Sequence, residues 1–179
     1  MLDFVILLLA ISVFSSQVWS TAVHFEMSEM QSGAKIVIAM VIIGLITLCS
    51  IVARFEQPPL AQYAGAAMLL GSLAVFWWAI RETRSAKLRA VFTTKNPHTL
   101  VQTGPYAYVR HPFYSSYVLF WLGLALGSWS IIGGAFFILL FIIYWRAAAD
   151  EEQKFLTTDM ADAYRAFADK RARLVPPFL

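Results

Sequence analysis

The residues best suited to chemistry gather in one short segment, 104–117. It reads GPYAYVRHPFYSSY and contains the chain's one Arg-His dipeptide, Arg110-His111, together with four tyrosines, Tyr106, Tyr108, Tyr114 and Tyr117. Guanidinium and imidazole groups can pair with anions, whereas tyrosine ring faces attract cations. All three residue types are also common at membrane interfaces, so anchoring of a helix end is the alternative interpretation.

A second candidate group is the acidic run Asp150, Glu151 and Glu152, which follows three alanines without a helix-breaking residue between. Adjacent carboxylates beside a bilayer repel one another and lose hydration, so they are rarely placed there without a function. We interpret them as a site for a cationic group. A solvated extension of a helix is the alternative.

The third candidate segment is the tail, where aromatic and basic residues alternate from Tyr164 to Arg173. With Met160 and Ala163, this pattern indicates an amphipathic helix lying on the membrane and ended by Pro176. Such a helix would serve either as a lid over a site or as an anchor. The pattern does not distinguish these roles.

Composition identifies the setting of these segments as a membrane. Hydrophobic residues make up 59% of the 179 residues and charged residues 14%, unlike the composition of a soluble domain. Asp3 stands where a signal peptide would carry basic residues, so the first apolar stretch is interpreted as a span. With Cys49 alone, neither a disulfide nor a cysteine-based zinc site is expected, and we expect no metal site.

Because a membrane-spanning helix needs about 20 apolar residues, we predict an all-α integral membrane protein with about five transmembrane helices. The Pro58-Pro59 pair should break the chain between the second and third spans, and a short turn around Trp129 should make the last two spans a hairpin. The predicted spans are residues 4–20, 34–53, 61–80, 112–127 and 130–148.

Twelve of the 14 Lys and Arg residues lie in two regions, 81–110 and 146–173. The positive-inside rule places both regions in the cytosol and the N-terminus outside, so the two regions share one face. Within the first, residues 81–92 read as a basic amphipathic helix, interpreted as a lipid anchor. We therefore predict a multi-pass protein of the bacterial inner membrane or the endoplasmic reticulum, active on the cytosolic side.

We interpret residues 1–179 as a single membrane domain with no detachable part. It divides into three N-terminal spans, a cytosolic connector, a helical hairpin and a cytosolic C-terminal helix with its tail, at residues 1–80, 81–111, 112–149 and 150–179.

These elements, in this order, resemble the isoprenylcysteine carboxyl methyltransferase family and the related phospholipid methyltransferases. The resemblance covers residues 99–178. It rests on Gly104-Pro105-Tyr106, Arg110-His111-Pro112-Phe113-Tyr114, the Glu151-Glu152 pair, Tyr164, and Arg173 to Pro176. Two positions depart from the pattern: the Glu pair lies one residue further from Tyr164, and Phe167 replaces the second tail tyrosine.

The resemblance implies a methyltransferase that uses S-adenosylmethionine, bound at the cytosolic end of the last two spans within 99–178. Arg173 is implied near the reacting groups, and His111 would be the base for an ammonium acceptor. The cofactor-binding residues expected from the resemblance and from residue chemistry are His111, Tyr114, Tyr106, Arg110, Gly123, Gly127, and Glu151 or Glu152.

The expected acceptor is lipidic or small and apolar, and O-methylation of an isoprenylcysteine-like carboxylate is favoured. Phospholipid N-methylation and thiol S-methylation are alternatives within the superfamily. A sterol-type reductase that uses NADPH and a non-enzymatic membrane subunit are alternatives of other classes. Membrane lipids are expected partners, and no nucleic acid is.

Overall fold

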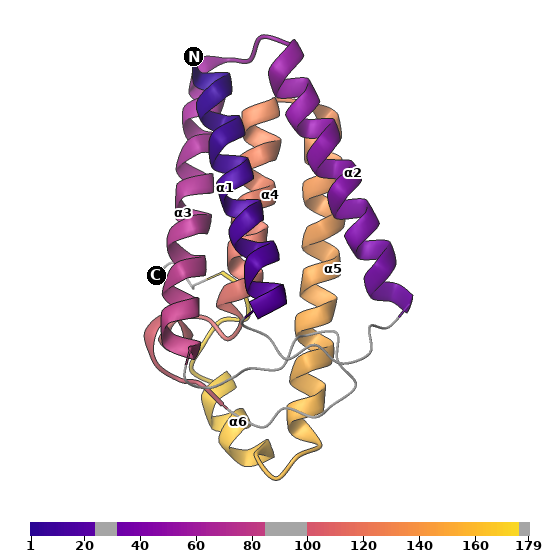
Figure 1. The fold of residues 1–179 in the computed structure, drawn as a ribbon. Helices are drawn as coiled ribbons and strands as arrows, with labels where there is room; N and C mark the ends of the chain where they lie inside the picture. The colour runs from indigo at the N-terminus through magenta and orange to yellow at the C-terminus, as the bar shows by residue number, and fades with distance from the viewer. Residues whose placement is uncertain (24–31, 85–99, 176–179) are drawn as a thin grey trace.

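The computed structural model describes residues 1–23, 32–84 and 100–175, and most of these residues lie in helices. Figure 1 labels the α-helices. In chain order, the elements are α1 (Leu2–Val23), α2 (Ser32–Arg54), α3 (Pro59–Thr83), the 3-10 turn η1 (Gly104–Ala107), α4 (Pro112–Ser128), α5 (Ile131–Leu156) and α6 (Ala161–Ala168).

Four of these helices, α1, α2, α3 and α5, are long and apolar enough to cross a membrane. Helix α4 has 17 residues, at the lower end of what a bilayer requires, yet it is equally apolar along most of its length. The predicted all-α membrane architecture is confirmed.

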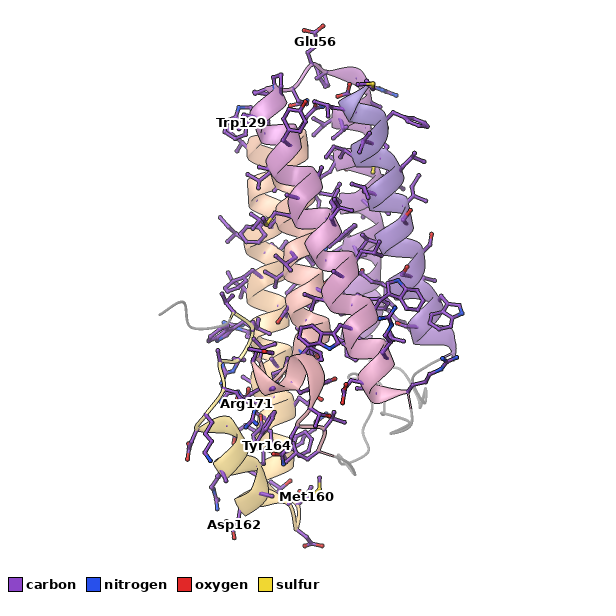
Figure 2. The ribbon with its side chains drawn as sticks, turned by 90° about the vertical axis from the view of Figure 1, so that its left-hand side faces the viewer. Glu56, Trp129, Met160, Asp162, Tyr164 and Arg171 are labelled. Atoms are coloured by element: carbon purple, nitrogen blue, oxygen red, sulfur yellow. The ribbon has the colours of Figure 1, made fainter. Side chains whose placement is uncertain are left out.

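Successive helices run in alternating directions (Figure 1). Helix α4 occupies the middle of the bundle and contacts α1, α2, α3 and α5. Helices α1, α3 and α5 end near η1 and α6, where α2 and α4 begin. In Figure 2, the labels of Met160, Asp162, Tyr164 and Arg171 mark this end, and those of Glu56 and Trp129 mark the opposite end.

The breaks between helices follow from local chemistry. Pro58 caps α3 and Pro59 is its first residue, where a missing N–H leaves no hydrogen bond unmade. At the other break, the Ser130 side chain accepts a 3.0 Å hydrogen bond from the Gly133 N–H and so caps α5. The predicted break and hairpin are confirmed.

Glycines allow α3 and α4 to pack closely. A Cβ atom added to Gly65 would lie 2.7 Å from the carbonyl oxygen of Gly123 and 2.7 Å from the nitrogen of Gly127. Both atoms belong to the α4 backbone and cannot move aside easily. Small residues commonly let membrane helices approach in this way, because backbone contact replaces the absent hydrophobic driving force.

The C-terminal helix is shorter than predicted. It ends at Ala168, not at Pro176, because residues after Asp169 leave the helix and pair with residue 109. Its apolar face is buried within the protein: Tyr164 and Phe167 pack with Phe155 of α5 and Tyr106 of η1. The helix therefore covers the connector and does not lay this face on the membrane.

Other predicted boundaries shift by a few residues. The last span was predicted to end at 148 and to run on as a helix, and α5 continues to Leu156. Helix α3 runs on to Thr83, so the predicted helix at 81–92 does not begin at 81. Most of that segment, from residue 85, lies outside the described residues.

We predict that Gly65→Ala lowers the free energy of unfolding by about 2 kcal/mol, since the added methyl group would force the α3 and α4 backbones apart. Thermal unfolding in detergent measures this loss. Gly134→Ala is the matched control, because a Cβ at Gly134 meets nothing within 4 Å. Equal melting temperatures for the two variants would contradict the packing described.

Candidate functional site

The connector that precedes α4 is fixed by the end of α3. Glu82 accepts a hydrogen bond from the Thr103 hydroxyl. Gly104 follows at φ 60°, and a Cβ there would lie 2.6 Å from the Glu82 carboxylate. This left-handed conformation and the close approach both require glycine. The GPY turn thus holds Tyr106 beneath α6 and sets the direction of the chain toward α4.

The tail lies alongside the connector as a short strap, residues 172–174. The Arg110 N–H donates to the Ala172 carbonyl at 2.9 Å, and the His111 N–H donates to the Arg173 carbonyl at 3.2 Å. Leu174 inserts into the main hydrophobic core with 2% of its surface exposed. The strap therefore places the Arg173 side chain beside the start of α4.

Glu152 is the centre of an ion-pair cluster at this end of the bundle. One carboxylate oxygen, Oε1, lies 3.1 Å from Arg110 Nε, 3.1 Å from His111 Nε2 and 3.1 Å from Arg173 Nε. The other, Oε2, accepts from Arg173 Nη2 at 2.8 Å. Glu152 is buried, so its charge depends on these partners.

Glu151 is the next residue, about 100° further around α5. Its Oε2 lies 3.7 Å from His111 Nδ1, and its side chain is 29% exposed. The imidazole of His111 thus has one carboxylate on each ring nitrogen. Glu151 has fewer partners than Glu152 and retains room for another.

Tyrosines of α4 and α5 lie next to this cluster, toward the middle of the helical bundle. The Tyr114 ring lies 5.6 Å from the His111 ring, 6.1 Å from Tyr117 and 5.8 Å from Tyr144 of α5, between ring centroids. The Tyr114 hydroxyl is buried and has no hydrogen-bond partner among the described residues. A buried hydroxyl without a partner is costly, so this group is available to a ligand.

Two further phenols close the cluster from the other side. Tyr164 stacks on Phe155 at 4.7 Å, and its buried hydroxyl also lacks a hydrogen-bond partner among the described residues. Burial, and less strongly the neighbouring carboxylates, raises the pKa of Tyr106 and of Tyr164 far above the usual phenol value. Both therefore remain protonated at physiological pH and can donate hydrogen bonds.

Most of the predicted site residues come together here. Glu152 is in direct contact with Arg110, His111 and Arg173. Glu151 and Tyr114 lie beside His111, whereas Tyr106 packs against α6.

Two predicted cofactor residues, Gly123 and Gly127, lie elsewhere. An added Cβ on Gly123 would meet Leu69 of α3, and one on Gly127 would meet Ile6 of α1. Gly123 is also about 16 Å along α4 from its first residue. The structure places these glycines in helix packing and does not bring them to the cluster.

Sequence reasoning did not single out Tyr144, and it gave Tyr164 no role in the site. A signal for Tyr144 exists in the spacing: Tyr144, Ala148 and Glu152 are four residues apart and share the buried face of α5. No comparable local signal marks the hydroxyl of Tyr164, because its burial depends on the fold of the tail.

Comparison with known proteins decides the family. The family model for phospholipid methyltransferases matches residues 60–162, more than half of the chain. The chain belongs to the phospholipid methyltransferase family. This family is in the same membrane methyltransferase superfamily as the isoprenylcysteine carboxyl methyltransferases, so the resemblance is confirmed. No curated protein and no solved structure matches the chain.

The range matched by the family model differs from the range covered by the motifs. It begins at residue 60 and so includes α3, which the motif comparison treated as uninformative. It ends at residue 162, before Tyr164 and the strap. Residues 163–175 lie outside the matched range, and the contacts described above place them at the site.

We predict that Glu152→Gln lowers the free energy of unfolding by about 2 kcal/mol, since it leaves Arg110 and Arg173 without their shared counter-charge. The loss is smaller than for a fully buried pair, because the Arg173 side chain is 22% exposed and partly hydrated. Chemical unfolding in detergent measures it.

Glu151→Gln is the control for that experiment, since Glu151 has one distant ion-pair contact and is partly exposed. It should change the free energy of unfolding by about 0.5 kcal/mol or less. If the two variants lost equal stability, Glu152 would not be the structural centre of the cluster.

Proposed function

We propose that this protein transfers a methyl group from S-adenosylmethionine to a lipidic acceptor at the cytosolic face of a membrane, with α4 as its fifth span. The observation that carries the proposal is the cluster of Arg110, His111, Glu152 and Arg173 in a chain of the phospholipid methyltransferase family. Members of this family generally use that cofactor.

Charge supports the proposed orientation. Among the described Lys and Arg residues, Arg54 lies at the opposite end of the bundle from the cluster, whereas Arg81, Arg84 and Arg110 share the cluster's end (Figure 1). The basic residues of α6 and the strap lie there too. By the positive-inside rule, this end faces the cytosol.

The chemistry of the side chains fits the cofactor. S-adenosylmethionine presents a sulfonium and an ammonium, a carboxylate, a ribose diol and an adenine ring. The hydroxyls of Tyr114 and Tyr164, which have no hydrogen-bond partner among the described residues, supply donors. The ring of Tyr114 supplies a π face, and Arg110 supplies positive charge for the carboxylate.

We infer that Glu151, and not Glu152, is the acidic ligand. Arg110, His111 and Arg173 already occupy both oxygens of Glu152. Glu151 is adjacent and partly exposed, and its contact with His111 is long, at 3.7 Å, so its carboxylate can accept from an ammonium or a ribose hydroxyl. Glu152 then acts as the positioning residue.

When bound, the cofactor supplies an electrophilic methyl group on its sulfonium. The protein contributes position and exclusion of water, which suits a displacement that loses charge as it proceeds. Helix α6 covers the cluster with Tyr164 and Phe167, and Tyr114 closes it toward the bilayer. Arg173, held by Glu152, is oriented beside the reacting groups.

The acceptor is proposed as a carboxylate or a phospholipid amine. A carboxylate, as in isoprenylcysteine, needs no base. A phospholipid amine is the second candidate, favoured by the family match, and its ammonium must first lose a proton. With the proton on His111 Nε2 facing Glu152, Nδ1 has the free lone pair, and Glu151 would stabilise the proton taken up there.

Calorimetry with S-adenosylhomocysteine tests the proposal. The purified protein should bind it, whereas Glu151→Gln should weaken binding about tenfold or more because a charged hydrogen-bond acceptor is lost. Asp150→Asn is the control, since Asp150 is exposed in the same acidic run, and it should bind as the wild type does.

Binding of NADPH in place of S-adenosylhomocysteine would identify a reductase and overturn the proposal. Binding of neither would indicate a non-enzymatic subunit. Unchanged affinity in Glu151→Gln together with a lost affinity in a stably folded Glu152→Gln would reverse the roles given to the two glutamates.

A further inference from the structure

An aromatic stripe runs along one flank of α5 toward the candidate site. Phe137, Phe141 and Trp145 are four residues apart, so they lie above one another on the helix over about 12 Å. The ring centroids of Phe137 and Phe141 are 6.1 Å apart, and those of Phe141 and Trp145 are 6.0 Å apart. The two phenylalanines are half-buried and Trp145 is 43% exposed.

Arg173 joins this stripe to the ion-pair cluster. Its guanidinium carbon lies 4.7 Å from the centre of the Trp145 ring, while Nε and Nη2 donate to Glu152 on its inner side. The third nitrogen, Nη1, has no hydrogen-bond partner among the described residues. Arg173 thus stands at the boundary between the buried cluster and the outer surface of α5.

We propose that the stripe formed by Phe137, Phe141 and Trp145 is the surface along which the acceptor lipid approaches, with Arg173 receiving the anionic group of that lipid. This inference rests on the proposed methyl transfer and adds the route and the recognition of its acceptor. The lipid's apolar chain would lie over the three rings, parallel to α5.

The positive charge of Arg173 favours a lipid with an anionic group over an uncharged membrane lipid. The guanidinium has donors left after pairing with Glu152, and it lies where the apolar stripe ends. A phosphate or a carboxylate placed there would lie beside the cluster in which Arg173 and His111 both contact Glu152. The parallel row of Ile138 and Ile142 also ends at a cation, Arg146, four residues further along α5, but it is Arg173 that contacts Glu152 of the cluster.

Steady-state kinetics with the full-length protein in mixed micelles test the route. Trp145→Ala should raise KM for the acceptor about fivefold or more, with S-adenosylhomocysteine affinity unchanged, because apolar and cation–π contacts are lost. Trp78→Ala is the matched control: Trp78 is 44% exposed, lies near the same end of the bundle on α3, and should leave KM unchanged.

Acceptors with apolar chains of different length distinguish the contribution of the stripe from that of Arg173. Phe141→Ala should raise KM for dipalmitoyl phosphatidylethanolamine or N-acetyl-S-farnesylcysteine, whichever is methylated, and should have no effect on a short-chain analogue of the same acceptor. Which of the two is methylated identifies the anionic group as phosphate or carboxylate. Equal KM values for Trp145→Ala, Phe141→Ala and wild type would overturn the proposal.

Photocrosslinking tests the route in the wild-type protein, so it requires neither turnover nor a folded variant. Either acceptor, with a diazirine in its chain, should label Phe137, Phe141 or Trp145, and excess unlabelled acceptor should suppress the labelling. Labelling spread over the exposed isoleucines of α2 would show bulk lipid and reject the route. Failure of the wild type to bind S-adenosylhomocysteine would instead reject the proposed function, whatever the labelling pattern.

Discussion

The ion-pair cluster around Glu152 is the interaction on which the described site depends. Two arginines meet at the end of an apolar bundle with a histidine beside them, and an arginine charge there would be costly without a partner. The buried carboxylate of Glu152 pairs with both guanidinium groups and lies beside the imidazole of His111. Because its partners come from the connector, the start of α4 and the tail, this single side chain of α5 joins these segments by charge, in addition to the apolar contacts of Leu174, Tyr106 and Tyr164.

Glu151 and Glu152 illustrate how adjacent identical residues acquire different roles. Rotation of about 100° per residue turns Glu152 toward the face that also carries Tyr144 and Ala148, whereas Glu151 lies further around the helix and its side chain is 29% exposed. The sequence left open which glutamate is the ligand. The distinction depends on which side of α5 faces α4, and this is a property of packing between helices that no local pattern encodes.

Hydropathy and proline positions predicted the helices and their breaks because both act locally, through burial of apolar surface and loss of an N–H group. The order of motifs predicted that Arg110, His111, Glu152 and Arg173 belong together. The end of α6 was not predictable, since the strap's hydrogen bonds to residues 110 and 111 compete with the helix only in the folded chain. Gly123 and Gly127 were predicted to bind the cofactor, although two glycines four residues apart are equally typical of close contact between membrane helices.

The pairing of residue 109 with residue 172 also has a consequence for how the protein is made. The strap follows α1 to α6 in the chain, so it is the last of these elements to leave the ribosome. During synthesis, Arg110 and His111 therefore emerge before Arg173 and the covering α6. The bundle of α1 to α5 can assemble before the charged cluster is complete, so the two are separate events.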